Sequence, residues 1–175
     1  MQISGHKTRE VFERYNIMNE LFLPSGIPNI LQKLNEHGAL YLVIGGYAVR
    51  YYGCRKMVDD FDILIKSSIE NSENIYPVFK EINYTPNFTV KELSKPGKKI
   101  YLEHYLIEIM TSTDKFNFEE AYKSKEIVME KGLQIPVISL EKLICLKELA
   151  LKEDNSREHK ELEDIECLKS KLKLH

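Results

Sequence analysis

The sequence lacks the long apolar run that a membrane span requires. The chain has 175 residues, and its apolar stretches, such as residues 40–44, fall far short of the roughly 20 residues needed to cross a bilayer. The first residues also lack the apolar segment of a secretory signal. These absences argue against a membrane protein and favour a cytoplasmic location.

Cysteine, glycine and proline are scarce, and neither sign of charge dominates. The chain has 3 Cys, 8 Gly and 6 Pro, and its 25 basic and 27 acidic residues give a net charge of −2. Because Cys54, Cys145 and Cys167 form no C-x-x-C pair, we expect no cysteine metal site but reduced thiols in or near the core. With 43% hydrophobic residues, the composition is that of an ordinary globular protein.

The length predicts one domain, which we place at residues 24–175 after a leader over residues 1–23. Patterns of apolar residues predict the elements in this order: a helix near residues 30–36 capped by Asn29, a strand over 40–44, a helix over 47–52, a strand over 61–65, a helix over 72–82, two strands within 99–110, a strand pair at 125–129 and 134–138, and helices over 140–151 and around 162–172. This order predicts an α+β fold with a small mixed sheet, flanking helices and additional C-terminal helices.

Three carboxylates are predicted to meet on one face of the sheet. Asp60 and Asp62 are two residues apart at the start of a strand, so their side chains point to the same side. Glu108 lies on a later strand that alternates in the same way. Carboxylates this crowded would be relieved by a hard divalent cation such as Mg²⁺.

A pair of glycines stands between a predicted strand and a predicted helix. The backbone N–H groups of Gly45 and Gly46 can take a phosphate at such a helix start, because no side chain blocks the approach. Each pattern alone has a plainer interpretation. A Gly-Gly is typical of tight turns, and an Asp-x-Asp is typical of a solvated strand edge.

In combination, these patterns resemble the DNA polymerase β-type nucleotidyltransferase superfamily in its minimal, single-domain bacterial form. The similarity rests on residues 42–49 and on Asp60-Phe61-Asp62. It implies that the glycine turn holds nucleotide phosphates and that Asp60 and Asp62, with Glu108 as the third acid, bind Mg²⁺ or Mn²⁺. It also implies transfer of a nucleoside monophosphate from an NTP to a hydroxyl acceptor, with release of pyrophosphate.

The C-terminal part is similar to the closing helices of nucleotidyltransferases related to abortive-infection toxins of toxin–antitoxin systems. This similarity rests on residues 138–144 and on Lys147, Arg157, Lys160 and Asp164. It implies that Lys147 contacts the triphosphate and that Asp164 orients the basic groups. The plainer interpretations are an exposed helix lysine for Lys147 and a solvated loop charge for Arg157.

Four positions depart from the family pattern. Lys56 and Val58 replace the Arg and Thr of many relatives, Glu161 follows Lys160 where Asp is frequent, and Glu108 is commonly Asp. Charge and size are roughly kept, so the departures bear on substrate and rate more than on reaction class. We therefore assign Lys56 to nucleotide binding together with Gly45, Gly46, Lys147 and Arg157.

The acceptor is not specified by these motifs. Relatives modify tRNA ends, protein hydroxyls or small drugs. The net charge of −2 argues mildly against broad nucleic-acid binding, although Lys91, Lys95, Lys98 and Lys99 could form a local basic patch. The alternative function is a nucleotidyltransferase-like antitoxin or regulatory module that binds a toxin or antitoxin partner.

A second resemblance is confined to the N-terminus. Gly5-His6 and Tyr15 resemble the final motif of tyrosine recombinases. The arginines and the catalytic domain that would activate Tyr15 are absent, so this segment is assigned no activity and is predicted to be a weakly packed leader.

Overall fold

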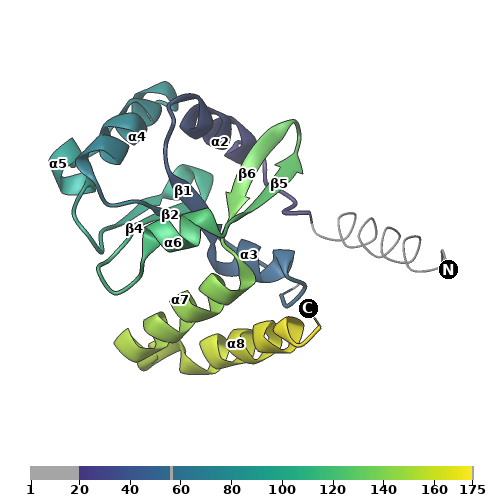
Figure 1. Ribbon diagram of the computed structural model, residues 1–175. Helices are drawn as coiled ribbons and strands as arrows, with labels where there is room; N and C mark the ends of the chain where they lie inside the picture. Colours follow the sequence, from purple (N-terminus) through teal and green to yellow (C-terminus); the bar gives the residue numbers. More distant parts are fainter. Residues whose placement is uncertain (1–19, 56, 175) are drawn as a thin grey trace.

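A six-stranded mixed sheet forms the centre of the part of the chain described by the computed structural model, residues 20–55 and 57–174 (Figure 1). Its strands are β1 (Tyr41–Ile44), β2 (Phe61–Ile65), β3 (Lys99–Leu102), β4 (Ile107–Thr111), β5 (Glu126–Glu130) and β6 (Leu133–Val137). The strand order is β3-β4-β2-β1-β6-β5. The pairs β2–β4 and β1–β6 are parallel, and the other neighbours are antiparallel.

Helices lie on both sides of this sheet. They are α2 (Ile27–Glu36), α3 (Gly45–Tyr51), α4 (Ile69–Glu81), α5 (Val90–Leu93), α6 (Phe118–Lys123), α7 (Leu140–Glu153) and α8 (Glu158–Leu172). In Figure 1, α2, α4 and α5 lie above the sheet and α3, α7 and α8 lie below it. The predicted α+β fold with a small mixed sheet and C-terminal helices is confirmed.

The two faces of the sheet differ in chemistry because side chains alternate along each strand. One face is apolar and buried, and it carries Tyr41, Val43, Phe61, Ile63, Ile65, Ile107 and Ile109. The opposite face carries Asp62 and Glu108 beside Leu64 and Met110. We call this second surface the acid face. It is the face toward which α7 packs.

Most predicted elements are present, but several boundaries differ: α4 begins at Ile69 and not at residue 72, α8 begins at Glu158 and not near residue 162, and α6 was not predicted. Ser139 caps α7 by accepting a hydrogen bond from the Lys142 N–H, as its position predicts. The prediction that Asn29 caps the first helix is wrong, because α2 already begins at Ile27 with a proline in its first turn. Proline fits there because a first-turn residue needs no N–H partner.

The prediction of reduced thiols in or near the core is wrong for Cys54 and Cys167, whereas Cys145 is a free thiol that lies at the surface. Cys54, in the loop after α3, forms a disulfide with Cys167 of α8, with 5.7 Å between the two Cα atoms. Sequence spacing could not show this pairing, because the two partners are 113 residues apart and meet only when α8 folds against the loop.

The last residues of the predicted leader are part of the folded core. Leu21 and Leu23 are buried in the main core, so the packed part of the chain already includes residues assigned to the leader. The recombinase-like motif lies outside the described residues. Within residues 20–55 and 57–174, none of the helices combines the length and apolar character that a membrane crossing demands.

Candidate active site

The glycine pair opens α3 directly after β1. Gly45 has a φ of +63°, and a Cβ atom at this position would lie 2.0 Å from Asp62 Oδ2. A side chain is therefore excluded both by backbone conformation and by space. The N–H of Gly46 donates a hydrogen bond to the Asp62 carboxylate. The glycine turn thus contacts Asp62, which lies 16 residues after Gly46 in the sequence.

Strand pairing brings the predicted acids together. Asp62 is the register partner of Ile44 on β1 and of Glu108 on β4. Asp60, two residues before Asp62, accepts a hydrogen bond of 3.2 Å from the Tyr101 hydroxyl. Tyr101 itself lies opposite Glu108 in the β3–β4 pair. Three strands therefore place Asp60, Asp62 and Glu108 at one end of the acid face.

The environment of Asp62 disfavours its charged form. Burial is the largest cause, and the neighbouring charges of Glu108 and Asp60 add to it, so that the pKa of Asp62 rises from 3.8 to about 7. The Lys147 amino group and the Gly46 N–H oppose this rise but do not cancel it. A carboxylate under such strain is typical of a site that needs a cation.

The side chains do not, as they stand, form a ready metal cage. Among residues 20–55 and 57–174, no group of three or more His, Cys, Asp or Glu side chains is close enough to hold one ion. The donor chemistry nevertheless suits Mg²⁺ or Mn²⁺, because carboxylate oxygens are the ligands that these cations prefer.

A buried ion network borders the acids. The amino group of Lys147 lies 2.9 Å from Glu161 and 2.9 Å from Asp164, and all three side chains are largely buried. Asp164 also pairs with Arg55. This network joins α7, α8 and the loop after α3. Lys147 is therefore neither an exposed helix lysine nor, in this arrangement, a free cation.

Two cavities meet at the acids. The first, which we call the basic cavity, measures about 540 Å³ and is lined by Gly46, Arg55, Met57, Val58, Asp59, Asp60, Asp62, Glu108, Ser156, Arg157, His159 and Lys160. The second, which we call the central cavity, measures about 430 Å³ and reaches along α7 past Lys147 and Ala150, with Glu161 of α8 also in its lining. Both cavities share Asp62, Glu108, Ser156 and Arg157. The acids thus stand at the junction of one open cleft.

Most of the predicted site residues line one of the two cavities of the cleft. Gly46 and Arg157 line the basic cavity, and Gly45 and Lys147 line the central one. Lys56 lies outside the described residues. Sequence reasoning missed Arg55 and Tyr101. Tyr101 could have been found by extending the alternation of Glu108 to the neighbouring strand, whereas no local signal marks Arg55.

Residues 25–175 match the protein family described as "Nucleotidyl transferase of unknown function (DUF2204)". The match spans most of the chain. The chain belongs to this nucleotidyl transferase family. This family agrees with the nucleotidyltransferase resemblance of the glycine turn and the acid pair. It does not specify the acceptor.

Solved structures support the fold of this nucleotidyl transferase. An antigenic nucleotidyltransferase-like protein from Paracoccidioides brasiliensis is similar with a TM-score of 0.53 and 16% identity, covering 79% of this chain and 71% of that one. A protein from Thermotoga maritima assigned as a nucleotidyltransferase has a TM-score of 0.51 and 22% identity, covering 78% and 89%. ANT(2″)-Ia, solved with adenylyl-2″-tobramycin, has a TM-score of 0.52 and 16% identity, covering 83% and 87%. No curated protein matches the chain.

Proposed function

We propose that this protein transfers a nucleoside monophosphate from an NTP to a hydroxyl acceptor and releases pyrophosphate, with Asp60, Asp62 and Glu108 holding Mg²⁺ or Mn²⁺. The observation that carries the proposal is the convergence of these acids with the glycine turn on one cleft. Gly46 donates to Asp62, and Glu108 is the register partner of Asp62.

The cleft offers the charges that a triphosphate requires. Besides the three acids, the described lining of the basic cavity carries Arg55, Arg157 and Lys160 against the single acid Asp59. Guanidinium groups bind phosphate oxygens in pairs and lysine adds a mobile charge. The polyphosphate is therefore expected to lie in the basic cavity, with the α-phosphate toward the acids.

In the proposed reaction, a bond forms between the acceptor oxygen and the α-phosphorus while the bond from that phosphorus to the bridging oxygen of the β-phosphate breaks. Pyrophosphate carries the electron pair away, and the acceptor proton passes to a carboxylate of the acid cluster. A bound divalent cation would supply charge neutralisation for the phosphate oxygens. Arg157 and Lys160 would hold the polyphosphate, and Lys147 would keep Glu161 and Asp164 neutralised beneath it.

The decisive experiment removes a carboxylate without removing volume. Each α-labelled NTP is incubated with Mg²⁺, purified protein and total cell extract, and label transfer is measured for wild type, Asp60→Asn and the control Asp114→Asn. We expect Asp60→Asn to abolish transfer while its melting temperature stays near that of wild type. Asp114 is outside every cavity lining of the site and exposed, so its variant keeps activity. Normal transfer by Asp60→Asn would contradict the proposal.

One observation favours a second candidate, an antitoxin-like or regulatory module of the same fold. The acids are not arranged as a three-ligand cage among the described residues, and Lys147 is occupied by Glu161 and Asp164. A module of this kind would bind a toxin or antitoxin partner without transferring label. Binding of an NTP that requires Mg²⁺, measured by calorimetry, distinguishes the enzyme from this module.

A further inference from the structure

A third cavity continues the cleft away from the phosphates. We call it the apolar cavity. It measures about 220 Å³ and lies between the β2–β4 part of the acid face and α7, lined chiefly by Leu64, Met110, Phe116, Leu146 and Leu149. Hydroxyl groups of the loop after β4, including Thr113, complete one wall. No element of the described chain fills this space.

The apolar cavity opens from the reaction centre. It shares six lining residues with the central cavity, among them Ile44, Lys99 and Met110. The central cavity in turn contains Asp62 and Glu108. A ligand that starts at the acids can therefore extend past Met110 into the apolar cavity without leaving the cleft.

The positions of the leaving group and of the attacking hydroxyl at the phosphorus determine which of the two occupies the central cavity. Apart from the three acids, the central cavity balances Lys99, Lys147 and Arg157 against Glu153, Asp154 and Glu161. On the same basis the basic cavity carries Arg157, Lys160 and the Asp164-paired Arg55 against Asp59 alone. The leaving pyrophosphate therefore belongs in the basic cavity. Because attacking and leaving oxygens lie roughly in line at the phosphorus, the acceptor hydroxyl must approach from the opposite side, through the central cavity.

We propose that the acceptor is a small hydroxyl compound bearing one ring-sized apolar group, which occupies the apolar cavity beside Met110 while its hydroxyl reaches the acids. This inference rests on the proposed function. The volume sets the size of the group, since an apolar cavity of about 150 Å³ is enough to hold benzene. The available 220 Å³ therefore accommodates one substituted ring and excludes a body of several rings.

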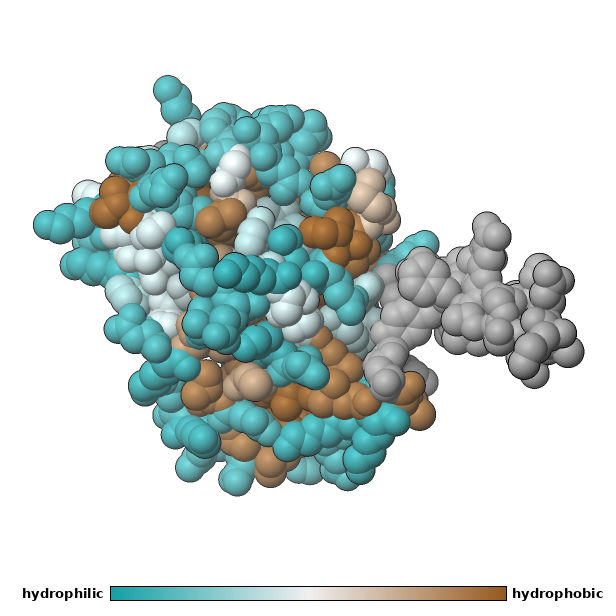
Figure 2. All heavy atoms as spheres, viewed as in Figure 1, coloured by the Kyte–Doolittle hydropathy of each residue, from teal (hydrophilic) through white to brown (hydrophobic). Residues whose placement is uncertain are grey.

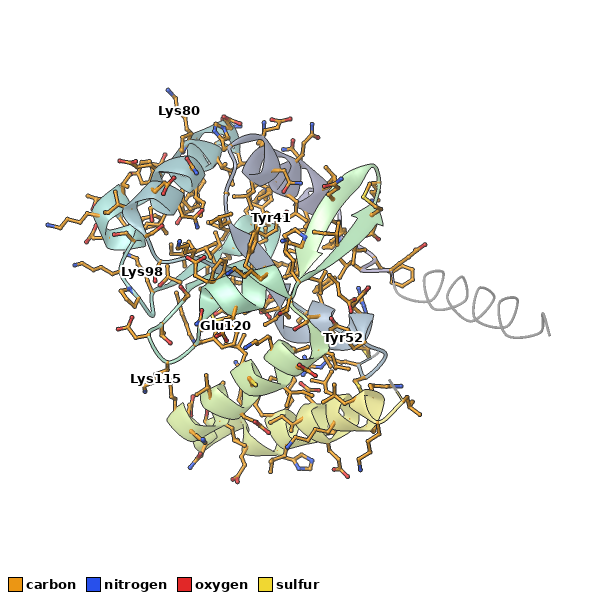
Figure 3. All side chains as sticks on the ribbon, in the orientation of Figure 1. Tyr41, Tyr52, Lys80, Lys98, Lys115 and Glu120 are labelled. Atoms are coloured by element: carbon orange, nitrogen blue, oxygen red, sulfur yellow. A yellow bond between two sulfur atoms is a disulfide. The ribbon has the colours of Figure 1, made fainter. Side chains whose placement is uncertain are left out.

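The rim of the cavity selects the charge of the acceptor. Lys99 and Lys115 line it against one acid, Glu153, which pairs with Lys115 at 2.9 Å. Lys98 also lines the rim, with its amino group 4.8 Å from the centre of the Phe88 ring. Lys98 and Lys115 lie on the same side of the molecule (Figure 3). Like charges repel across such a rim, so it disfavours a polycation and tolerates a neutral or anionic compound. This distinguishes the acceptor from tobramycin, whose adenylyl product is bound in the structure of ANT(2″)-Ia.

Methionine methyl groups report on the two ends of the cleft separately. Met110 lines the apolar cavity, Met57 lines the basic cavity, and Met129 is exposed on β5 far from both linings. In ¹³C-methyl-methionine NMR spectra of the full chain, we expect benzyl alcohol to shift Met110 and to leave Met57 and Met129 unchanged. Tobramycin at the same concentration should shift none of them. Shifts caused by tobramycin but not by benzyl alcohol would overturn the proposal.

A variant that fills the apolar cavity, together with a matched control variant, tests whether the acceptor binds there. Thr113→Phe places a ring in the apolar cavity, whereas Asp114→Phe adds the same ring at the next, exposed residue outside it. Thr113→Phe should weaken benzyl alcohol binding at least about tenfold and abolish labelling of the acceptor from cell extract. Asp114→Phe should preserve both.

Binding of the NTP separates this inference from the proposed function. Each α,β-methylene NTP with Mg²⁺ should bind Thr113→Phe within about twofold of wild type. If Thr113→Phe weakens NTP binding instead, the cavity holds the nucleobase and the inference is wrong, although the enzyme proposal stands. If no NTP binds wild type while benzyl alcohol still shifts Met110, the proposed function fails and the cavity assignment as a ring-binding site remains.

Discussion

At the scale of single residues, the site depends on how closely Gly45 approaches Asp62. The left-handed conformation of Gly45 and the missing side chain let the first turn of α3 lie against the Asp62 carboxylate. The same closeness lets Gly46 donate its N–H to that carboxylate. One residue pair therefore connects the turn proposed to bind phosphate with the acids proposed to bind the cation.

Gly45→Ala tests this contact, and Gly38→Ala is its control. Both glycines have positive φ, +63° for Gly45 and +68° for Gly38, but only Gly45 would place a Cβ against a neighbour, since nothing lies within 4 Å of Gly38. Gly38→Ala should cost about 1–2 kcal/mol of unfolding free energy from backbone strain alone. Gly45→Ala should cost about 1–3 kcal/mol more because Asp62 must move. Urea unfolding measures both, and equal losses would show that the contact is unimportant.

The titration of Asp62 gives a second prediction. Because its pKa in the folded protein is raised from 3.8 to about 7, the metal-free protein should be most stable below about pH 4 with respect to this group and should lose that stability as pH rises through about 7. The unfolding free energy lost through this ionisation is at most about 4 kcal/mol. This upper limit is for Asp60, Asp62 and Glu108 together, because their charges interact. Asp62→Asn should therefore stabilise the metal-free protein at about pH 8 and have little effect near pH 4.5.

Denaturant unfolding in EDTA at these two pH values measures the effect. Asp114→Asn serves as the control because Asp114 is exposed and lies outside the cavity linings of the cleft. A variant that is destabilised equally at both pH values would show that Asp62 is not under electrostatic strain.

At the scale of elements, the sequence predicted those features that depend on local patterns, such as the face of a strand or the start of a helix. Alternation on β4 placed Glu108 on the same face as Met110, and the register with β2 confirms that face. Ser139, as a typical N-cap residue, correctly predicted the start of α7. The short helix α5 was missed although Thr89 and Glu92 form a capping box, because four residues show no apolar period. The Cys54–Cys167 pairing was missed because it depends on tertiary contact alone.

The disulfide should stabilise the contact between the loop after α3 and α8. It closes a loop of 113 residues, and a cross-link over such a distance mainly restricts the unfolded chain. Cys54→Ser, or reduction of wild type by a dithiol, should lower the unfolding free energy by about 2–4 kcal/mol. Cys145→Ser is the matched control, since Cys145 is exposed and unpaired. Unchanged urea midpoints after reduction would mean that the bond does not constrain the protein in solution.

At the scale of the whole molecule, the cleft exists because two halves of the chain meet. The acids come from the sheet, whereas Lys147, Arg157 and Lys160 come from α7, α8 and the turn between them. Hydrophobic residues gather over these C-terminal helices in Figure 2. Sequence motifs identified each half but not the cavities between them. The family resemblance implied that Asp164 orients basic groups, whereas the pairing of Lys147 with Glu161 had no signal in the sequence. Such contacts depend on packing at long sequence distance.

Binding of a cation at the acids should be visible in the stability of the entire domain. A ligand that binds only the folded state stabilises it by about 2.7 kcal/mol at one hundred times its Kd, and for a chain of this size each kcal/mol raises Tm by about 2–4 °C. Mg²⁺ at such a concentration should therefore raise the Tm of wild type by about 5–10 °C. Mg²⁺ with an NTP should raise it further, because in the proposed binding mode the polyphosphate would bridge the sheet and the C-terminal helices.

The variants assign this stabilisation to the acid cluster. Asp60→Asn should lose most of the Mg²⁺-dependent rise, because one of the three proposed ligands is gone, while Asp114→Asn should keep it. An NTP without Mg²⁺ should raise Tm little, since the polyphosphate would then face Asp60, Asp62 and Glu108 without a cation between like charges. A rise of the same size in Asp60→Asn would mean that the ion binds elsewhere, and no rise in wild type at millimolar Mg²⁺ would remove the physical basis for assigning these three carboxylates to a metal.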